Sequence, residues 1–255
     1  MNLTAKTFLD VFYERLAKRG FRIAGTGQPY LCRVVNEEIV QVLSFLESDS
    51  GMADCHLLHV VGGVASVYRE QMPFSRPPQE NAAWLPEADV FYAMMYPQNT
   101  NLPFAENLRG FPFRIGDAQT IRWAVWEAVD AAEQFILPQI TDIGNAEECL
   151  LFYRRCGLPL AIDEDNAEGW LIALCDCDAD ISRQTGQWLH YLMKRDALTQ
   201  EELDTAKAAV LKTERELSVR RSEMLADAEL LDANLRMLQW RKAANLEWLR
   251  CAGIL

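Results

Sequence analysis

Residues 187–252 contain neither glycine nor proline, and this uninterrupted stretch constrains the fold of the 255-residue chain more than any other feature. Glycine and proline are the residues that most disfavour a helix interior, so their absence predicts the longest helical region of the protein. Thr199 and Glu202 have the T-x-x-E spacing of a capping box. This spacing predicts that a helix begins near residue 200.

The apolar pattern of this stretch distinguishes a coiled coil from one or two separate long helices. Apolar residues recur at every seventh position: Leu203, Val210, Leu217, Met224, Leu231 and Leu238. A coiled coil needs a second apolar seam, and the line four residues further on contains Lys207, Glu214 and Arg221 instead. We therefore expect one or two long helices, with any break near residues 218–224. A helix of this length would extend beyond a compact domain. It would therefore need a partner chain, or a neighbouring segment of the same chain that folds back onto it.

The first third of the chain changes from a helical to a strand pattern. Residues 3–19 carry one apolar stripe that ends at Gly20, and its members are Phe8, Val11, Phe12 and Leu16. Short apolar runs separated by turn residues follow at 21–24, 30–35, 38–46 and 55–61. They predict an antiparallel meander, with a turn at Asn36-Glu37. The run EIVQVLSFL is apolar on both faces, so we expect it at the centre of the sheet.

Residues 70–116 differ in composition, since they hold seven of the ten prolines and eight aromatic residues. A disordered linker would be poor in aromatic residues, so we predict an ordered, irregular excursion packed on the sheet, with one strand near 89–95. Exposed aromatic and arginine side chains anchor interfaces. The candidate binding residues are therefore Trp84, Tyr92, Tyr96, Arg109, Phe111, Phe113 and Arg114. The alternative, that these rings cover one face of the sheet, is favoured because aromatic residues mostly fill cores.

The later part of the chain predicts covering helices. Asp117 is placed to cap a helix whose regular part ends at Pro138, a second helix covers 146–155, and the apolar run WLIALC predicts a strand. The fold class is α+β, with an N-terminal helix, an antiparallel meander sheet, covering helices and a long-helix C-terminal region. The predicted divisions are an α+β domain over 1–156, a strand/helix connector packed on it over 157–198, and a helical extension or hairpin over 199–255.

Five residues within positions 1–156 form a pattern of short motifs. Gly20 and Phe21 make a turn after the first helix, Gln41 precedes an apolar run in a strand, and Leu137-Pro138 end a later helix. In these motifs the chain resembles a family of uncharacterised bacterial α+β domains of unknown function. The resemblance implies an α+β fold and a bacterial, intracellular origin, and it supplies no catalytic residues.

The histidines are the first residues to consider for a metal site or for catalysis. Cys55, His56 and His59 are close in sequence, but on a strand the two histidines point to opposite faces. His190 lies in a helical pattern, and the chain has no nucleophile elbow, phosphate-binding loop, dinucleotide fingerprint or H-E-x-x-H motif. We therefore expect no metal ion and no cofactor. Whether the protein is an enzyme stays open, and a non-catalytic role is favoured.

The CDCDAD run at residues 175–180 is the other candidate for a metal or redox site. It begins like a calcium-binding loop, but Ile181 stands where glycine is needed and Gln187 where a bidentate glutamate is needed. A redox pair would normally use the C-x-x-C spacing. The run is best explained as the end of a strand followed by a solvated acidic turn.

Charge and composition narrow the class of partner. The chain carries 37 acidic and 25 basic residues, and residues 117–180 alone hold 14 acidic residues against 3 basic ones. An acidic surface argues against binding to nucleic-acid phosphates and favours a basic partner. No secretory signal and no apolar stretch of membrane-spanning length is visible, and the seven cysteines do not suggest a disulfide scaffold. These features predict a cytoplasmic protein that binds neither membranes nor nucleic acid.

The predicted function is that of a non-catalytic protein-binding module, of the adaptor or immunity kind. The expected partner is another protein, and residues 200–252 offer a surface for a homodimer. The alternative is a small-molecule-binding domain or a cryptic hydrolase, with a pocket between the sheet and residues 70–116.

Overall fold

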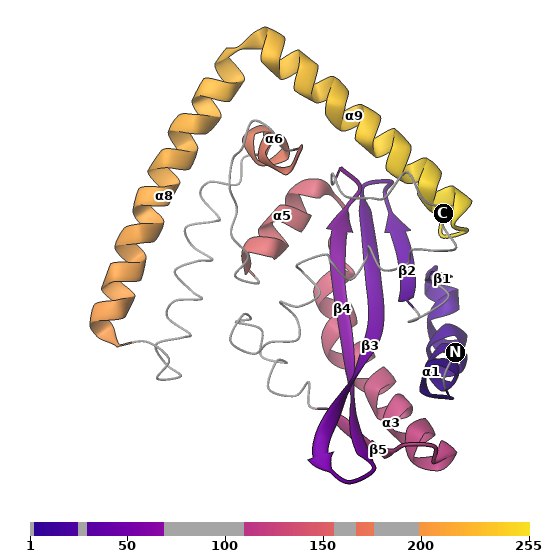
Figure 1. Ribbon diagram of the computed structural model, residues 1–255. Helices are drawn as coiled ribbons and strands as arrows, with labels where there is room; N and C mark the ends of the chain where they lie inside the picture. Colours follow the sequence, from indigo (N-terminus) through magenta and orange to yellow (C-terminus); the bar gives the residue numbers. More distant parts are fainter. Residues whose placement is uncertain (1–2, 25–29, 69–109, 156–166, 176–198) are drawn as a thin grey trace.

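The computed structural model describes residues 3–24, 30–68, 110–155, 167–175 and 199–255, which form an α+β fold (Figure 1). A five-stranded antiparallel sheet lies at the centre of this described part, and helices pack against it. The predicted strand near 89–95 lies outside the described residues.

The strands of the sheet follow one another in sequence order, so the predicted meander is confirmed. They are β1 (Arg22–Ala24), β2 (Tyr30–Val35), β3 (Ile39–Met52), β4 (Cys55–Ser66) and β5 (Phe111–Arg114). The strand that is apolar on both faces, β3, is central, as expected, and both β3 and β4 are longer than the sequence predicts. The prediction that residues 70–116 are irregular up to their end is wrong for β5, because this strand pairs with residues 55–58 of β4.

The turn between β2 and β3 forms at the predicted residues without a glycine. Asn36 and Glu37 both have positive φ angles, 53° and 54°. With the hydrogen bond from the N–H of Glu38 to the carbonyl oxygen of Val35, at 3.0 Å, these angles form a tight turn whose hand matches the twist of the strands, and asparagine tolerates the left-handed conformation better than most residues. The Asn36 amide also donates to the carbonyl oxygen of Gly144, at 2.9 Å, so the turn is held to the segment before the next helix.

Helices precede, cover and follow the sheet. In chain order they are α1 (Leu3–Leu16), the 3₁₀ turn η1 (Ala17–Arg19), α3 (Ala118–Ala131), the π-helical turn η5 (Ala132–Ile136), α4 (Leu137–Ile140), α5 (Ala146–Arg155), α6 (Ala167–Leu174), α8 (Gln200–Ala226) and α9 (Ala228–Cys251). The π-helical turn comes directly before Leu137-Pro138, and Pro138 cannot donate the backbone hydrogen bond that a regular helix needs there.

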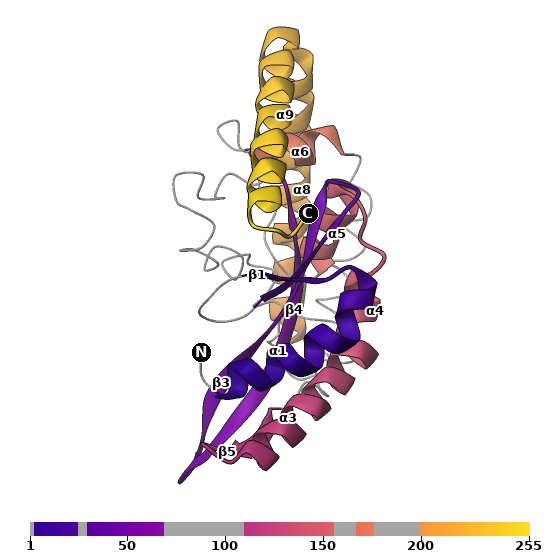
Figure 2. The same ribbon diagram turned by 90° about the vertical axis from the view of Figure 1, so that its right-hand side faces the viewer.

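α1 and α3 lie side by side across one face of the sheet (Figures 1 and 2). The predicted stripe of α1 is fully buried at Phe8, whose ring packs on Phe12 and on Phe45 of β3. Asp117 caps α3 as predicted, since its carboxylate accepts hydrogen bonds from the backbone N–H groups of Gln119 and Thr120. The two helices and the sheet therefore enclose one core.

The motif residues that carry the family resemblance contribute to a polar cluster under α4. The buried Gln41 amide donates to the carbonyl oxygens of Ile140 (2.6 Å) and Ile143 (3.2 Å), and its own oxygen accepts from the Arg33 guanidinium. That guanidinium stacks on the Phe21 ring, 4.9 Å from its centre. Phe21 and Gln41 therefore help to hold β2 and β3 against the end of the α3–α4 segment.

The prediction of a strand for WLIALC is wrong, because residues 167–174 form the helix α6. A short, continuous apolar run has no periodicity that separates a buried strand from a buried helix. Alanine and leucine are strong helix formers, and Trp170, Leu171, Ile172 and Ala173 are all buried, as expected of a helix enclosed on every side.

The C-terminal region consists of two helices, α8 and α9, that meet at Asp227 and diverge in an open V (Figure 1), which Figure 2 shows edge-on. The predicted capping box at Thr199 and Glu202 is present. The break lies just beyond the predicted residues 218–224. Asp227 ends α8 in an extended conformation, and its carboxylate caps α9 by accepting from the N–H groups of Glu229 and Leu230.

The second half of α9 packs against the turn end of the sheet. Asn245 is fully buried and donates to the carbonyl oxygen of Val67, and the Lys242 ammonium lies 3.7 Å from the Glu38 carboxylate. Glu38 also accepts from the backbone N–H of Ala146 at the start of α5, at 3.1 Å. The helical region is therefore attached to the α+β part, and the boundaries at 156 and 199 stay predictions.

Candidate protein-binding surface

Three of the seven predicted binding residues lie in the described part of the chain, all on β5. Phe113 is only 3% exposed and packs edge-on against the ring of His56, Phe111 is half-buried, and Arg114 is exposed. The other four, Trp84, Tyr92, Tyr96 and Arg109, lie outside the described residues. For Phe113 the geometry matches the alternative that the ring fills the core.

The outer edge of β5 is closed to a further strand. Pro112 has no N–H group to offer a partner. The N–H of Arg114 donates to the hydroxyl of Thr120 at 3.0 Å, and the carbonyl oxygen of Arg114 accepts from the N–H of Asp117 at 3.1 Å. A peptide therefore gains no strand-addition site along β5, since an open edge with free N–H and C=O groups is what such binding requires.

The two histidines of β4 point to opposite faces of the sheet, as the strand period predicts. His56 faces Phe113, and its Nδ1 lies 4.0 Å from the Glu47 carboxylate. His59 lies on the other face, where its Nε2 is 2.8 Å from the hydroxyl of Ser48. Burial lowers the pKa of His59, so its ring is neutral at pH 7.

The most exposed aromatic pair of α3 was not among the predicted binding residues. Trp123 is 50% exposed and Trp126 is 41% exposed, on the side of α3 that faces away from the sheet. The buried side of the same helix is formed by Ile121, Ala124, Val125, Ala128, Val129 and Ala131. The sequence holds the information, because the buried stripe at helical spacing leaves both tryptophans on the outer side. We call Trp123, Trp126, Glu127 and Asp130 the tryptophan face.

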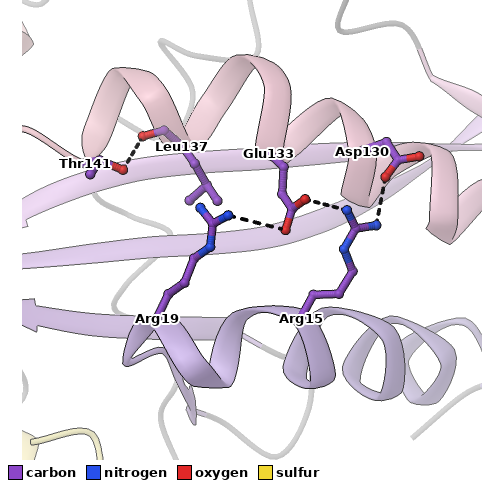
Figure 3. Close-up of polar contacts among 6 residues, drawn as sticks. All are labelled: Arg15, Arg19, Asp130, Glu133, Leu137 and Thr141. Atoms are coloured by element: carbon purple, nitrogen blue, oxygen red, sulfur yellow. Dashed lines mark hydrogen bonds and ion pairs between the residues drawn. The ribbon is translucent and has the colours of Figure 1, made fainter.

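An arginine from α1 is bound at one end of the tryptophan face. The guanidinium of Arg15 lies 2.8 Å from the Asp130 carboxylate and pairs with Glu133 as well (Figure 3). It also sits 5.3 Å from the centre of the Trp126 ring. Arg19 reaches the other oxygen of Glu133, at 4.0 Å. Partial burial opposes the charge of Arg15, but the two carboxylates outweigh it and raise its pKa.

Figure 3 also shows Leu137 and Thr141, where the chain continues from α3 through α4. The hydroxyl of Thr141 donates to the carbonyl oxygen of Leu137 at 2.6 Å. The same carbonyl oxygen also accepts the helical hydrogen bond from the backbone N–H of Thr141, at 2.9 Å. The hydrogen bonds from Gln41 to the carbonyl oxygens of Ile140 and Ile143 hold the end of α4 to β3, so the segment that runs on from the tryptophan face is fixed at its C-terminal end.

The other end of the tryptophan face has the same side chains without an arginine. Trp123 and Glu127 are one helical step apart, at i and i+4, as are Trp126 and Asp130. Within the described part of the chain, the side chains of Trp123 and Glu127 make no hydrogen bond, ion pair or ring contact with another residue. The tryptophan face therefore carries one occupied and one open position of similar composition.

No family model, no curated protein and no solved structure matches this chain. The resemblance of residues 1–156 to a bacterial family consequently stays a prediction.

The C-terminal helices expose apolar side chains too. Leu211 and Val219 on α8 are 52% and 60% exposed, and Trp240 on α9 is 64% exposed. Across the described residues, no helix has the length and apolar character needed to span a membrane. Within that same part of the chain, no group of three His, Cys, Asp or Glu side chains is close enough to hold a metal ion.

Proposed function

We propose that this protein is a non-catalytic protein-binding module, of the adaptor or immunity kind, and that the tryptophan face is its docking surface. The observation that carries the proposal is the exposure of two neighbouring tryptophans on one rigid helix. Tryptophan and arginine are the residues most enriched at the energetic centres of interfaces, and a monomer gains nothing by leaving two indoles in water.

The support of α3 makes the tryptophan face suitable for binding. Its inner side is buried in the core, its N-terminus is capped by Asp117, and Arg15 joins it to α1. A rigid platform loses little conformational entropy when a partner binds. A homodimer through residues 200–252 is a second part of the proposal, supported by the exposed Leu211 and Val219 of α8. A bacterial, cytoplasmic setting is part of the same proposal and rests on the sequence.

The test compares three baits against one library of bacterial protein fragments in a two-hybrid screen. The baits are the wild-type chain, the double variant Trp123→Ala/Trp126→Ala, and the matched control Trp240→Ala, which removes an exposed indole from α9. We expect at least one partner that binds the wild type and the control but not the double variant, and calorimetry with the purified partner then measures the loss. Partners that bind all three baits equally would overturn the proposal.

The dimer is tested separately by light scattering. Leu211→Glu places a charge on the exposed side of α8 and should convert a dimer to a monomer, whereas the tryptophan double variant should leave the dimer intact. A wild-type chain that stays monomeric at high concentration would remove the homodimer from the proposal.

A second candidate, a cryptic hydrolase, is favoured by one observation, the 2.8 Å contact between the Ser48 hydroxyl and the neutral His59 ring. A serine beside a neutral histidine is the core of a nucleophilic site. Gly110, at the end of the 70–116 segment, lies against His59 so closely that a Cβ would be 2.6 Å from the ring. A fluorophosphonate probe should label the wild type and not Ser48→Ala if this candidate is right. Equal labelling of Ser48→Ala, or none of either, would exclude it.

A further inference from the structure

We infer that Trp123 and Glu127 form a binding position for an arginine side chain, and that the partner of the tryptophan face is a basic protein segment. This inference rests on the proposed function and names the chemistry of the partner.

The molecule itself contains an arginine bound in this way. The outer side of α3 binds the guanidinium of Arg15 by two contacts: the centre of the Trp126 ring lies 5.3 Å from it, and the carboxylate of Asp130 pairs with it at 2.8 Å. An aromatic face attracts a cation through its quadrupole, and the carboxylate adds an ion pair. The two contacts together hold the guanidinium at the helix surface.

The pair of a tryptophan and a carboxylate is repeated along α3. Trp123 precedes Glu127 by four residues, as Trp126 precedes Asp130, so in each case the indole and the carboxylate lie one above the other on the helix surface. Trp123 is more exposed than Trp126, 50% against 41%. The position at Trp123 is therefore open to a cation from outside the chain.

Charge also favours a cation at this position. α3 and the turn η5 carry the carboxylates Glu127, Asp130 and Glu133, and Arg15 of α1 pairs with the last two. Within the described residues Glu127 has no ion pair, and Arg122, the single base on α3, follows a different line of the helix from Glu127, because five residues separate them. An unpaired carboxylate attracts a basic segment and repels an acidic one.

The composition of the Trp123–Glu127 position favours arginine over lysine. A guanidinium is planar, stacks on an indole and presents several N–H donors at once, whereas an ammonium is a compact, strongly hydrated charge. A position made of a ring and a carboxylate uses both properties of the guanidinium. We therefore expect an arginine peptide to bind more tightly than its lysine counterpart.

The test is an NMR titration of the full chain with an acetylated peptide of four Arg-Gly repeats. The Trp123 indole N–H resonance should shift on titration, and the Trp240 resonance should not. Glu127→Gln should raise the Kd about three-fold or more, which is the size expected for loss of one exposed charge contact. The control Glu147→Gln removes one exposed carboxylate from α5 and should change the Kd by less than that.

Two further peptides separate this inference from the proposed function. The citrulline peptide keeps the shape of arginine without the charge and should not bind, and the lysine peptide should bind more weakly. Equal binding of the citrulline peptide, an unchanged Kd for Trp123→Ala, or no shift at millimolar peptide would each overturn the inference. The proposed function would survive these results if a two-hybrid partner still required Trp123 and Trp126. Thermal unfolding followed by circular dichroism verifies that each variant is folded.

Discussion

α3 and α8 are both exposed on one side, but they are stabilised in different ways. α3 has 14 residues and buries six of them, whereas α8 has 27 residues and, of its side chains that the structure describes, only Leu203 and Met224 are buried. α3 depends on the core. α8 depends on local terms, namely the capping box at Thr199 and the exposed ion pairs Lys212–Glu216 and Arg220–Glu223.

This difference bears on which surface binds with precision. Burial of one side fixes the rotation and position of a helix, so the tryptophans of α3 are presented in a defined geometry. Exposed ion pairs contribute little each, so the position of α8 depends on few tertiary contacts, among them the buried Met224 and the hydrogen bond from Arg221 to the carbonyl oxygen of Ala173. This difference supports the proposal of specific recognition at α3 and of weaker self-association through α8.

The largest expected effect tests the dependence of the α1–α3 layer on the core. Phe8→Ala removes a fully buried ring that packs on Phe12 and Phe45, and it should lower the free energy of unfolding by about 3–5 kcal/mol. Leu211→Ala on α8 removes an exposed side chain and should cost less than about 0.5 kcal/mol. Urea unfolding measures both. Similar losses for the two variants would contradict the contrast between the helices.

The next effect concerns the polar cluster that ties the α3–α4 segment to the sheet. Gln41→Leu leaves the carbonyl oxygens of Ile140 and Ile143 and the Arg33 guanidinium without their buried partner. The expected loss is about 2–3 kcal/mol, because an unsatisfied buried polar group costs its full desolvation energy. Gln119→Leu changes an exposed glutamine and serves as the control. A small loss for Gln41→Leu would mean that the cluster is not needed to hold α4.

Much of the α+β part could be predicted because its determinants are local. Apolar spacing places the buried stripe of α1, and single polar residues such as Asp117 and Thr199 mark helix starts by hydrogen bonds within three residues. The Asn36-Glu37 turn follows the same logic, since asparagine accepts a positive φ angle. Such features need no knowledge of distant contacts.

The features that the sequence does not predict depend on contacts between distant segments. α6 is a helix because it is enclosed between other helices, and its apolar run alone fits a strand equally well. β5 contains Pro112, which is tolerated since it lies at the edge of the sheet. The tryptophan face could be found from the buried stripe of α3, but the arginine bound to it comes from residue 15, more than a hundred positions away.

A smaller effect tests how the V of α8 and α9 is maintained. Asp227→Ala removes the carboxylate that caps α9, at an expected cost of about 1 kcal/mol. Alanine favours a continuous helix, so the angle between α8 and α9 should open and the two helices should become more nearly collinear. Spin labels at Leu211 and Leu235 report this as a longer distance by pulsed electron resonance. The control Asp232→Ala removes an exposed carboxylate paired with Arg236 and should leave the distance unchanged.

The smallest effect is a pH dependence confined to the start of α8. The Glu202 carboxylate accepts hydrogen bonds from the backbone N–H and the hydroxyl of Thr199, and these bonds lower its pKa below the ordinary value of 4.5. A lowered pKa in the folded state means that the bonds stabilise the helix start above pH 4.5 and are lost as the pH falls through the lowered value.

Hydrogen exchange at the Thr199 amide measures this change. Protection should be present at pH 6 and should decrease on acidification, after correction for the intrinsic exchange rate. Glu202→Gln should remove the pH dependence, whereas Glu201→Gln, which changes the neighbouring carboxylate outside the capping box, should retain it. Because α8 has few tertiary contacts, the loss should spread along its first turns. The same acidification should leave the amide protection of Val125 and Ala128 in α3 unchanged, because these residues lie in the apolar core beyond the N-terminal cap of that helix. Equal loss of protection in both helices would show that α8 and α3 unfold together and would contradict the distinction drawn between them.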